Sequence, residues 1–133
     1  NVQDGILVVD GTALNGGDGG VEGLVIGGGA AGEGNNISGN DSNGILIGLD
    51  VGADITGTVK VQGNTIGIGD DGSAVGNSQS GYAAETNTPA VNTTFGTDGD
   101  GTNDSGEGNY VGSNASVAAA VELPGVWVKP NAA

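Results

Sequence analysis

The 133-residue chain contains no cysteine, histidine, arginine or methionine. Without thiolate or imidazole groups it cannot form zinc, haem or iron–sulfur centres, nor a histidine-dependent catalytic triad. Only Lys60 and Lys129 stand against 16 acidic residues, which gives a net charge of −14 and excludes binding to a phosphate backbone. No apolar run approaches the ~18 residues of a membrane-spanning helix, so we expect no membrane insertion.

Glycine, with 30 residues, is abundant and separates short apolar runs. Each run has β-branched residues or leucine and is bounded by Gly, Asn or Asp, a pattern typical of short strands between tight turns. No helical periodicity is sustained, and we expect strand or irregular coil even in the alanine-rich stretch 116–122. The predicted strands lie at 5–9, 23–27, 44–48, 59–61 and 125–128, with a less apolar copy at 81–84.

A Gly-Asn dipeptide recurs at 39–40, 63–64, 76–77 and 108–109. Together with the apolar runs it indicates an internal repeat of about 22 residues, which suits one coil of a solenoid. Glycine permits turns through positive φ, and we expect each asparagine to hydrogen-bond to its copy in the next coil. We therefore predict an all-β, single-domain parallel β-helix (β-solenoid) of about six short coils over residues 1–133.

Two segments carry a family resemblance. NNISGNDSNGILIG (35–48) resembles the turn-and-strand repeat of right-handed parallel β-helices, the pectin-lyase-like superfamily. GNTIGIGDDGSAVGNSQSGY (63–82) is similar to a repeat of large secreted bacterial surface proteins, and 108–128 is a degenerate second copy. The resemblance implies the fold and a secreted or cell-surface location. It implies no single activity, because this fold supports lyases, hydrolases, adhesins and inert stalks.

An enzymatic function is disfavoured, and we assign no catalytic residues. A lyase-like calcium site with an arginine base cannot exist, because the chain has no arginine. Asp70 and Asp71 could form a carboxylate pair, but Asp-Asp-Gly at 70–72 is typical of a turn. Few aromatic residues are available as platforms for sugar binding.

Residues 86–107 interrupt the repeat, and we predict an irregular acidic loop there. Carboxylates separated by glycine are ligands that Ca²⁺ prefers, although Thr102 and Asn103 depart from the EF-hand pattern. Two interpretations follow, a calcium site and a solvated loop without an ion. The candidate metal ligands are Asp98, Asp100, Asp104 and Glu107.

Five Asn-x-Ser/Thr sequons occur in the chain. Asparagines at turns of the repeat are expected to serve the fold. The accessible candidates for glycan attachment are Asn92 and Asn103, which fall in the predicted loop.

The terminal coils of a solenoid have open strand edges, and we recognise no capping helix in the chain. Unpaired edges favour head-to-tail stacking of copies or strand donation to a neighbour, which would produce filaments. Side-chain alternation places Trp127 on the opposite side of its strand from the flanking valines. The expected subunit or ligand contacts are Ile6, Val8, Trp127 and Val128.

Three function classes follow. The favoured one is an extracellular structural β-helix module that associates end to end, as a filament subunit or adhesin-stalk segment. The alternative is a surface module that binds calcium or polysaccharide. The third is a polysaccharide lyase- or hydrolase-like enzyme, or a remnant of one.

Overall fold

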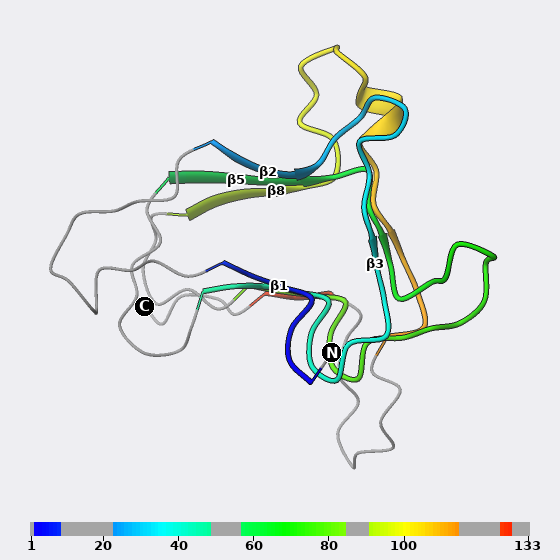
Figure 1. Cartoon of the computed structure of the whole chain (residues 1–133). Helices are drawn as coiled ribbons and strands as arrows, with labels where there is room; N and C mark the ends of the chain where they lie inside the picture. The colour runs from blue at the N-terminus through cyan, green and yellow to red at the C-terminus, as the bar shows by residue number, and fades with distance from the viewer. Residues whose placement is uncertain (1, 9–22, 49–56, 85–90, 115–125, 129–133) are drawn as a thin grey trace, which may run out of the picture.

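The computed structural model describes residues 2–8, 23–48, 57–84, 91–114 and 126–128. These residues form short strands and a single 3₁₀ turn, and none of them lies in an α-helix. Among the described residues there is likewise no helix with the length and apolar character to cross a membrane. The strands assemble into three parallel sheets (Figure 1).

We name these sheets A, B and C. Sheet A has the order β1 (Ile6–Val8), β4 (Ile45–Ile47), β7 (Tyr82–Ala84) and β10 (Val126–Val128). Sheet B has the order β2 (Leu24–Gly27), β5 (Gly57–Gln62) and β8 (Val91–Phe95). Sheet C has the order β3 (Asn36–Ile37), β6 (Thr65–Ile66) and β9 (Tyr110–Val111).

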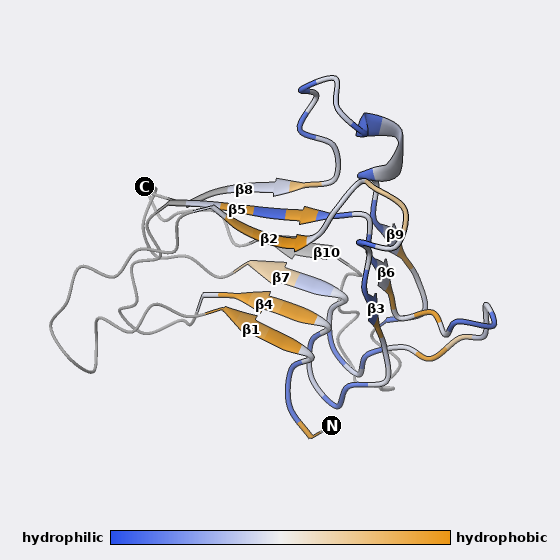
Figure 2. Ribbon diagram, turned by 45° about the horizontal axis from the view of Figure 1, so that its top comes forward, coloured by the Kyte–Doolittle hydropathy of each residue, from blue (hydrophilic) through white to orange (hydrophobic). Residues whose placement is uncertain are grey.

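The chain visits sheets A, B and C in turn, so successive coils stack on one another (Figure 2). Coil 1 consists of β1 to β3, coil 2 of β4 to β6 and coil 3 of β7 to β9, while β10 begins a fourth row in sheet A. Every pair of neighbouring strands is parallel. This all-β arrangement is consistent with the solenoid-like class that the sequence predicts.

The predicted coil length is wrong. Ile6 pairs with Ile45, Ile45 with Tyr82, and Tyr82 with Val126, so paired strands of sheet A lie 39, 37 and 44 residues apart. The described part of the chain contains neither coils of about 22 residues nor six coils. The apolar run at 23–27 contains β2 of sheet B, whereas the runs at 5–9 and 44–48 contain strands of sheet A. Treating all three as equivalent strands halves the length of a coil.

The predicted apolar runs coincide with β1, β2, β4, β5, β7 and β10, and those predictions are confirmed. The strand β8 was missed because VNTTF (91–95) is largely polar. The irregular segment expected at 86–107 is therefore shorter: within the described residues it begins at Gly96. The stretch 116–122 lies outside the described residues.

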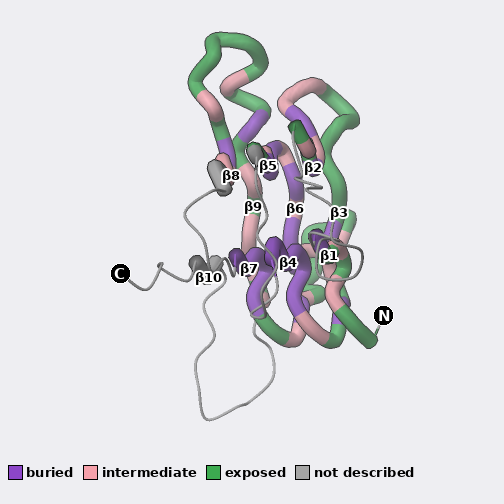
Figure 3. Tube along the Cα trace, turned by 90° about the vertical axis from the view of Figure 1, so that its left-hand side faces the viewer, coloured by how far each residue is buried: buried purple, intermediate pink, exposed green. Residues whose placement is uncertain are grey.

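The core lies between the sheets and is most complete in coil 2 (Figure 3). Ile45, Ile47, Val59, Val61 and Ile66 have no exposed surface. Their β-branched side chains fill a narrow interior in which each residue stacks on its copy in the next coil. In the third coil the rings of Tyr82 and Phe95 pack with centroids 4.6 Å apart.

Candidate metal centre and asparagine ladders

The first asparagine ladder joins Asn35, Asn64 and Asn109, at the corner between sheets B and C. The backbone N–H and Nδ2 of Asn35 donate to Oδ1 of Asn64 at 3.1 and 3.0 Å. The same two groups of Asn64 donate to Oδ1 of Asn109, each at 3.0 Å. Asn64 Nδ2 also contacts the carbonyls of Ile26 and Gln62, which ties the ladder to the neighbouring strands.

A second ladder joins Asn40, Asn77 and Asn114, at the corner between sheets C and A. Asn40 donates from its backbone N–H and Nδ2 to Oδ1 of Asn77, at 3.1 and 2.7 Å. Asn77 donates in the same way to Oδ1 of Asn114, at 3.2 and 2.7 Å. The prediction that Gly-Asn asparagines bond to their copies is thereby confirmed. In both ladders the earlier coil donates and the later coil accepts.

A third ladder precedes sheet A and runs in the opposite direction. Asn43 donates from its backbone N–H and Nδ2 to Oδ1 of Asp4, at 2.9 and 3.0 Å. Ser80 N–H donates to Oδ1 of Asn43 at 3.2 Å. Polar side chains at the corners therefore fix the register of successive coils, because each bond requires one coil to lie directly over the next.

The acidic loop grows from the corner between sheets B and C. Coil 2 turns tightly there, from Gln62 through Gly63 to Asn64, whereas coil 1 inserts 28–34 and coil 3 inserts 96–108. The two insertions meet across the tight turn: a Cβ added at Gly106 would lie 2.1 Å from the carbonyl oxygen of Gly29. Backbone contact supports the acidic loop, and only glycine permits an approach this close.

The four predicted metal ligands come together in this loop. Each can place one carboxylate oxygen so that all four oxygens lie within 4.8 Å of one another. Glu107 is only 5% exposed, so one of these charges is removed from water. An all-oxygen set of this kind suits a hard cation such as Ca²⁺. The set is Asp98, Asp100, Asp104 and Glu107.

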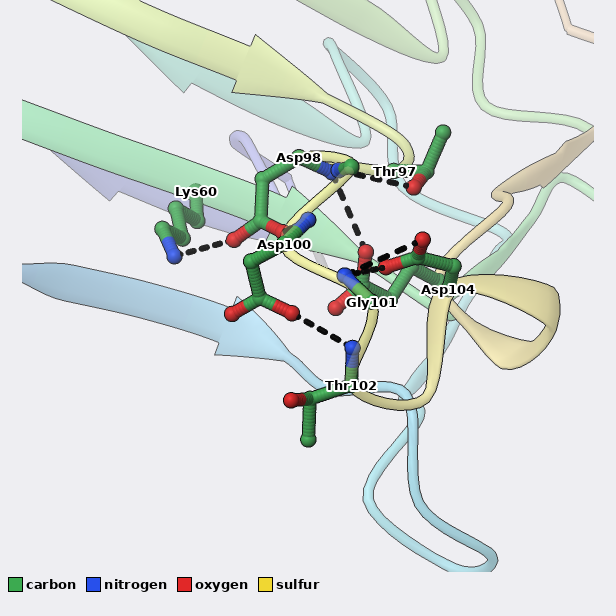
Figure 4. A network of polar contacts seen from close by, with 9 residues as sticks. Lys60, Thr97, Asp98, Asp100, Gly101, Thr102 and Asp104 are labelled. Carbon is green, nitrogen blue, oxygen red and sulfur yellow. Dashed lines mark hydrogen bonds and ion pairs between the residues drawn. The ribbon is translucent and has the colours of Figure 1, made fainter.

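Backbone N–H groups of the loop hold these carboxylates in place (Figure 4). Asp98 Oδ1 accepts from the N–H of Asp100, and Asp100 Oδ1 accepts from the N–H of Thr102, at 3.1 and 2.7 Å. Asp104 accepts from the N–H of Gly101, and Oε2 of Glu107 accepts from the N–H of Asp98. The carboxylates are thus preorganised by short-range bonds within the loop.

Lys60 is the only basic side chain in the described part of the chain, and it reaches the cluster from β5. Its Nζ pairs with Oδ2 of Asp98. This hydrogen bond is the main reason why the pKa of Lys60 is raised. The negative charges of Asp98, Asp100 and Glu107 raise this pKa further. The same hydrogen bond is also the main cause that lowers the pKa of Asp98. One ammonium group thus faces four carboxyl groups.

Gln62 lies beneath the loop on the same face of β5 as Lys60, since side chains alternate along a strand. It is 4% exposed, and its amide is close enough to Asp98 to contribute to the lowered pKa of that carboxyl. Yet Gln62 Nε2 has no hydrogen-bond partner. A buried amide that faces a carboxylate cluster without a bond is costly, and it is a candidate for ligand contact.

The other predicted site residues are scattered over the fold. Val8 lies in the core and Ile6 packs against it, whereas Leu7 between them is 47% exposed. Trp127 and Val128 belong to β10, where Trp127 is in register with Ala83, but their side chains lie outside the description. Contacts of these residues with a partner stay a prediction.

The two candidate glycan acceptors differ in position. Asn103 is exposed and has φ of 61°, before the 3₁₀ turn η1 (Asp104–Gly106). Asn92 lies in β8 rather than in a loop, and its side chain is outside the description.

The carboxylate pair weighed for catalysis forms a turn, as predicted. Ser73 N–H donates to Asp71 Oδ1 at 2.9 Å, and Gly72 has φ of 79°. Asp70 accepts a hydrogen bond from Asn36 Nδ2 at 2.7 Å, and both residues line an open, glycine-rich groove on sheet C. Tyr110, 67% exposed, lies in β9 of the same sheet, where a sugar platform would be accessible.

Comparison with protein-family models, curated proteins and solved structures finds no match to this chain.

Proposed function

We propose that the chain is a structural module: a single-domain parallel β-helix, secreted or displayed on a cell surface, that associates end to end. The observation that supports it most is the set of corner ladders. Most of the buried polar residues belong to three ladders that, together with three parallel sheets, stack one coil on another. Repetition of one contact along one axis suits an extended, rigid element.

Two features favour head-to-tail association. The strands β1, β2 and β3 each have a neighbour on one side only among the described strands, as do β8, β9 and β10 at the other end. Both Gly-Asn ladders have a direction, so the two ends of a stack carry unlike hydrogen-bonding groups. Unlike ends join in heterologous contacts, which build filaments rather than closed dimers.

Electron microscopy of negatively stained protein at micromolar concentration tests this proposal. We expect filaments of constant, narrow width, because uncovered strand edges pair with one another. Isolated small particles at every concentration would contradict end-to-end association.

A matched pair of variants at β1 locates the contact. Ile6 N–H bonds to the Gly44 carbonyl on the β4 side, so the N–H of Leu7 points to the open edge. We expect Leu7→Pro, which removes that N–H, to abolish filaments. Leu7→Ala keeps the N–H and is expected to retain them.

We propose calcium binding at the acidic loop as a second function. Four carboxylate oxygens within 4.8 Å, with one lysine among the described residues to balance them, favour a divalent cation. Beneath them lies the buried Gln62 side chain, whose Nε2 has no hydrogen-bond partner, and this supports a ligand contact at the same place. In this proposal the ion would stabilise the loop and neutralise part of the net charge of −14.

Thermal unfolding in calcium and in EDTA tests the second function. Because a ligand bound only by the folded state stabilises it, we expect millimolar Ca²⁺ to raise the midpoint by about 5–10 °C over EDTA. Asp104→Asn should remove most of this shift. The matched control is Asp41→Asn at an exposed position outside the cluster, which should keep it. Identical midpoints with Ca²⁺ and EDTA would exclude a structural calcium ion.

A further inference from the structure

We propose that Lys60 is a built-in competitor for the calcium site, whose ammonium group leaves Asp98 when Ca²⁺ binds, and that the Gln62 amide oxygen then becomes a ligand. This inference rests on the calcium binding proposed above and concerns how that binding is controlled. It is carried by the contacts of Asp98, by the exposure of Lys60 and by the unpaired Nε2 of Gln62.

Both oxygens of Asp98 are already engaged. Oδ1 accepts the N–H of Asp100 at 3.1 Å, and Oδ2 accepts the Lys60 ammonium. Oδ1 is held within the loop itself, whereas Oδ2 is held by a residue 38 positions away on β5. An ion that uses Asp98 as a ligand therefore takes Oδ2, and the ammonium must give way, since two cations at one oxygen repel each other.

Lys60 is able to leave the site. Its side chain is 41% exposed, against 13% for that of Asp98. Along sheet B it stands between Val25 and Thr94, on the outer face, where a lysine stem can extend into solvent. Displacement therefore moves a flexible, solvated side chain and leaves the preorganised loop in place.

Gln62 can provide a further ligand to the ion once the Lys60 ammonium has left Asp98. The side chain of Gln62 is buried and contributes to the environment of Asp98, and its Nε2 has no hydrogen-bond partner. Rotation of the amide by half a turn exchanges Nε2 and Oε1, which presents a neutral oxygen to the cluster. A carbonyl-type oxygen alongside carboxylates is a mixed ligand set that Ca²⁺ accepts. The ion would then be coordinated by an amide oxygen, and the Nε2 that has no hydrogen-bond partner would no longer face the cluster.

Calorimetric titration of the full chain with CaCl₂ tests the proposal on Lys60→Gln and Gln62→Leu. We expect Lys60→Gln to bind about ten-fold more tightly than the unchanged protein, because a competing charge is removed. Lys129→Gln makes the same change of net charge and should leave the affinity within about two-fold. We expect Gln62→Leu to bind several-fold more weakly, while circular dichroism in EDTA verifies that it is folded.

A second measurement follows the lysine itself. Acetylation of the unchanged protein by an amine-reactive ester, read by peptide mass spectrometry, should be several-fold faster at Lys60 with Ca²⁺ than with EDTA. Lys129 serves as the internal reference. Equal affinities of Lys60→Gln and the unchanged protein, with equal acetylation rates, would overturn the competition and leave calcium binding standing. Absence of binding in both proteins would overturn the calcium proposal itself.

Discussion

Replacement of Asn64 by alanine is expected to lower the free energy of unfolding by about 3–5 kcal/mol. Its side chain is 1% exposed and takes part in five hydrogen-bond contacts. Alanine can make none of them, and the change withdraws a shared partner from all three coils at once. Buried backbone groups that lose their side-chain partner have no route to water, which makes this loss larger than that of an exposed bond.

Urea unfolding of Asn64→Ala and of a control, Asn36→Ala, measures this effect. Asn36 is exposed, and its side chain makes two exposed hydrogen bonds, from Nδ2 to Asp70 and from Ser38 Oγ to its Oδ1, so its replacement should cost at most about 1 kcal/mol. If both variants lose similar, small amounts of stability, the ladder does not hold the coils together.

Replacement of Gly67 by alanine is the second large expected effect, a loss of about 4 kcal/mol. Gly67 has φ of 85°, and a Cβ built there would lie 2.1 Å from the carbonyl oxygen of Gly112 in the next coil. The left-handed backbone is one penalty. The larger penalty is the clash, because relieving it requires two coils to move apart where Gly112 N–H bonds to the Ile66 carbonyl.

Gly72→Ala separates these two causes. Gly72 has nearly the same φ, 79°, yet nothing lies within 4 Å of the added Cβ. Its replacement should cost only the conformational part, about 1–2 kcal/mol. Equal losses for the two variants, measured by chemical unfolding, would contradict the view that glycine at 67 is required by coil-to-coil contact.

Much of the fold was predictable because its strands are marked locally. Apolar runs bounded by glycine place β1, β4, β7 and β10, and the Gly-Asn dipeptide marks the corners. Asn35 was within reach, since Gly34 precedes it in the same pattern. Asn114 was not, because Ser113 stands where other copies have glycine and adopts φ of 55°. Local sequence signals therefore predict most strands and corners, but not the copies of the motif in which glycine is replaced.

The coil length and the environment of the site required the three-dimensional pairing. The acidic loop was recognisable from composition, because its carboxylates lie close together in sequence. Lys60 and Gln62 could not be assigned to it, since their contact with Asp98 depends on the register of β5 with β8, in which Lys60 pairs with Thr94. The sequence has no fixed period, because the corner insertions differ in length from coil to coil.

The Asp-Asp-Gly turn at 70–72 belongs to a small hairpin at 68–75, closed by an antiparallel bridge between Ile68 and Ala74, which has an implication for protein engineering. In coil 1, Ser38 and Gly39 lead directly from β3 to Asn40, and in coil 3, Gly112 and Ser113 lead directly from β9 to Asn114. Coil 2 inserts the hairpin at the same place, yet Asn77 stays in line with its two partners. This corner therefore accepts inserted residues without moving the ladder, and a foreign peptide could be displayed there with the stacking of the coils unchanged.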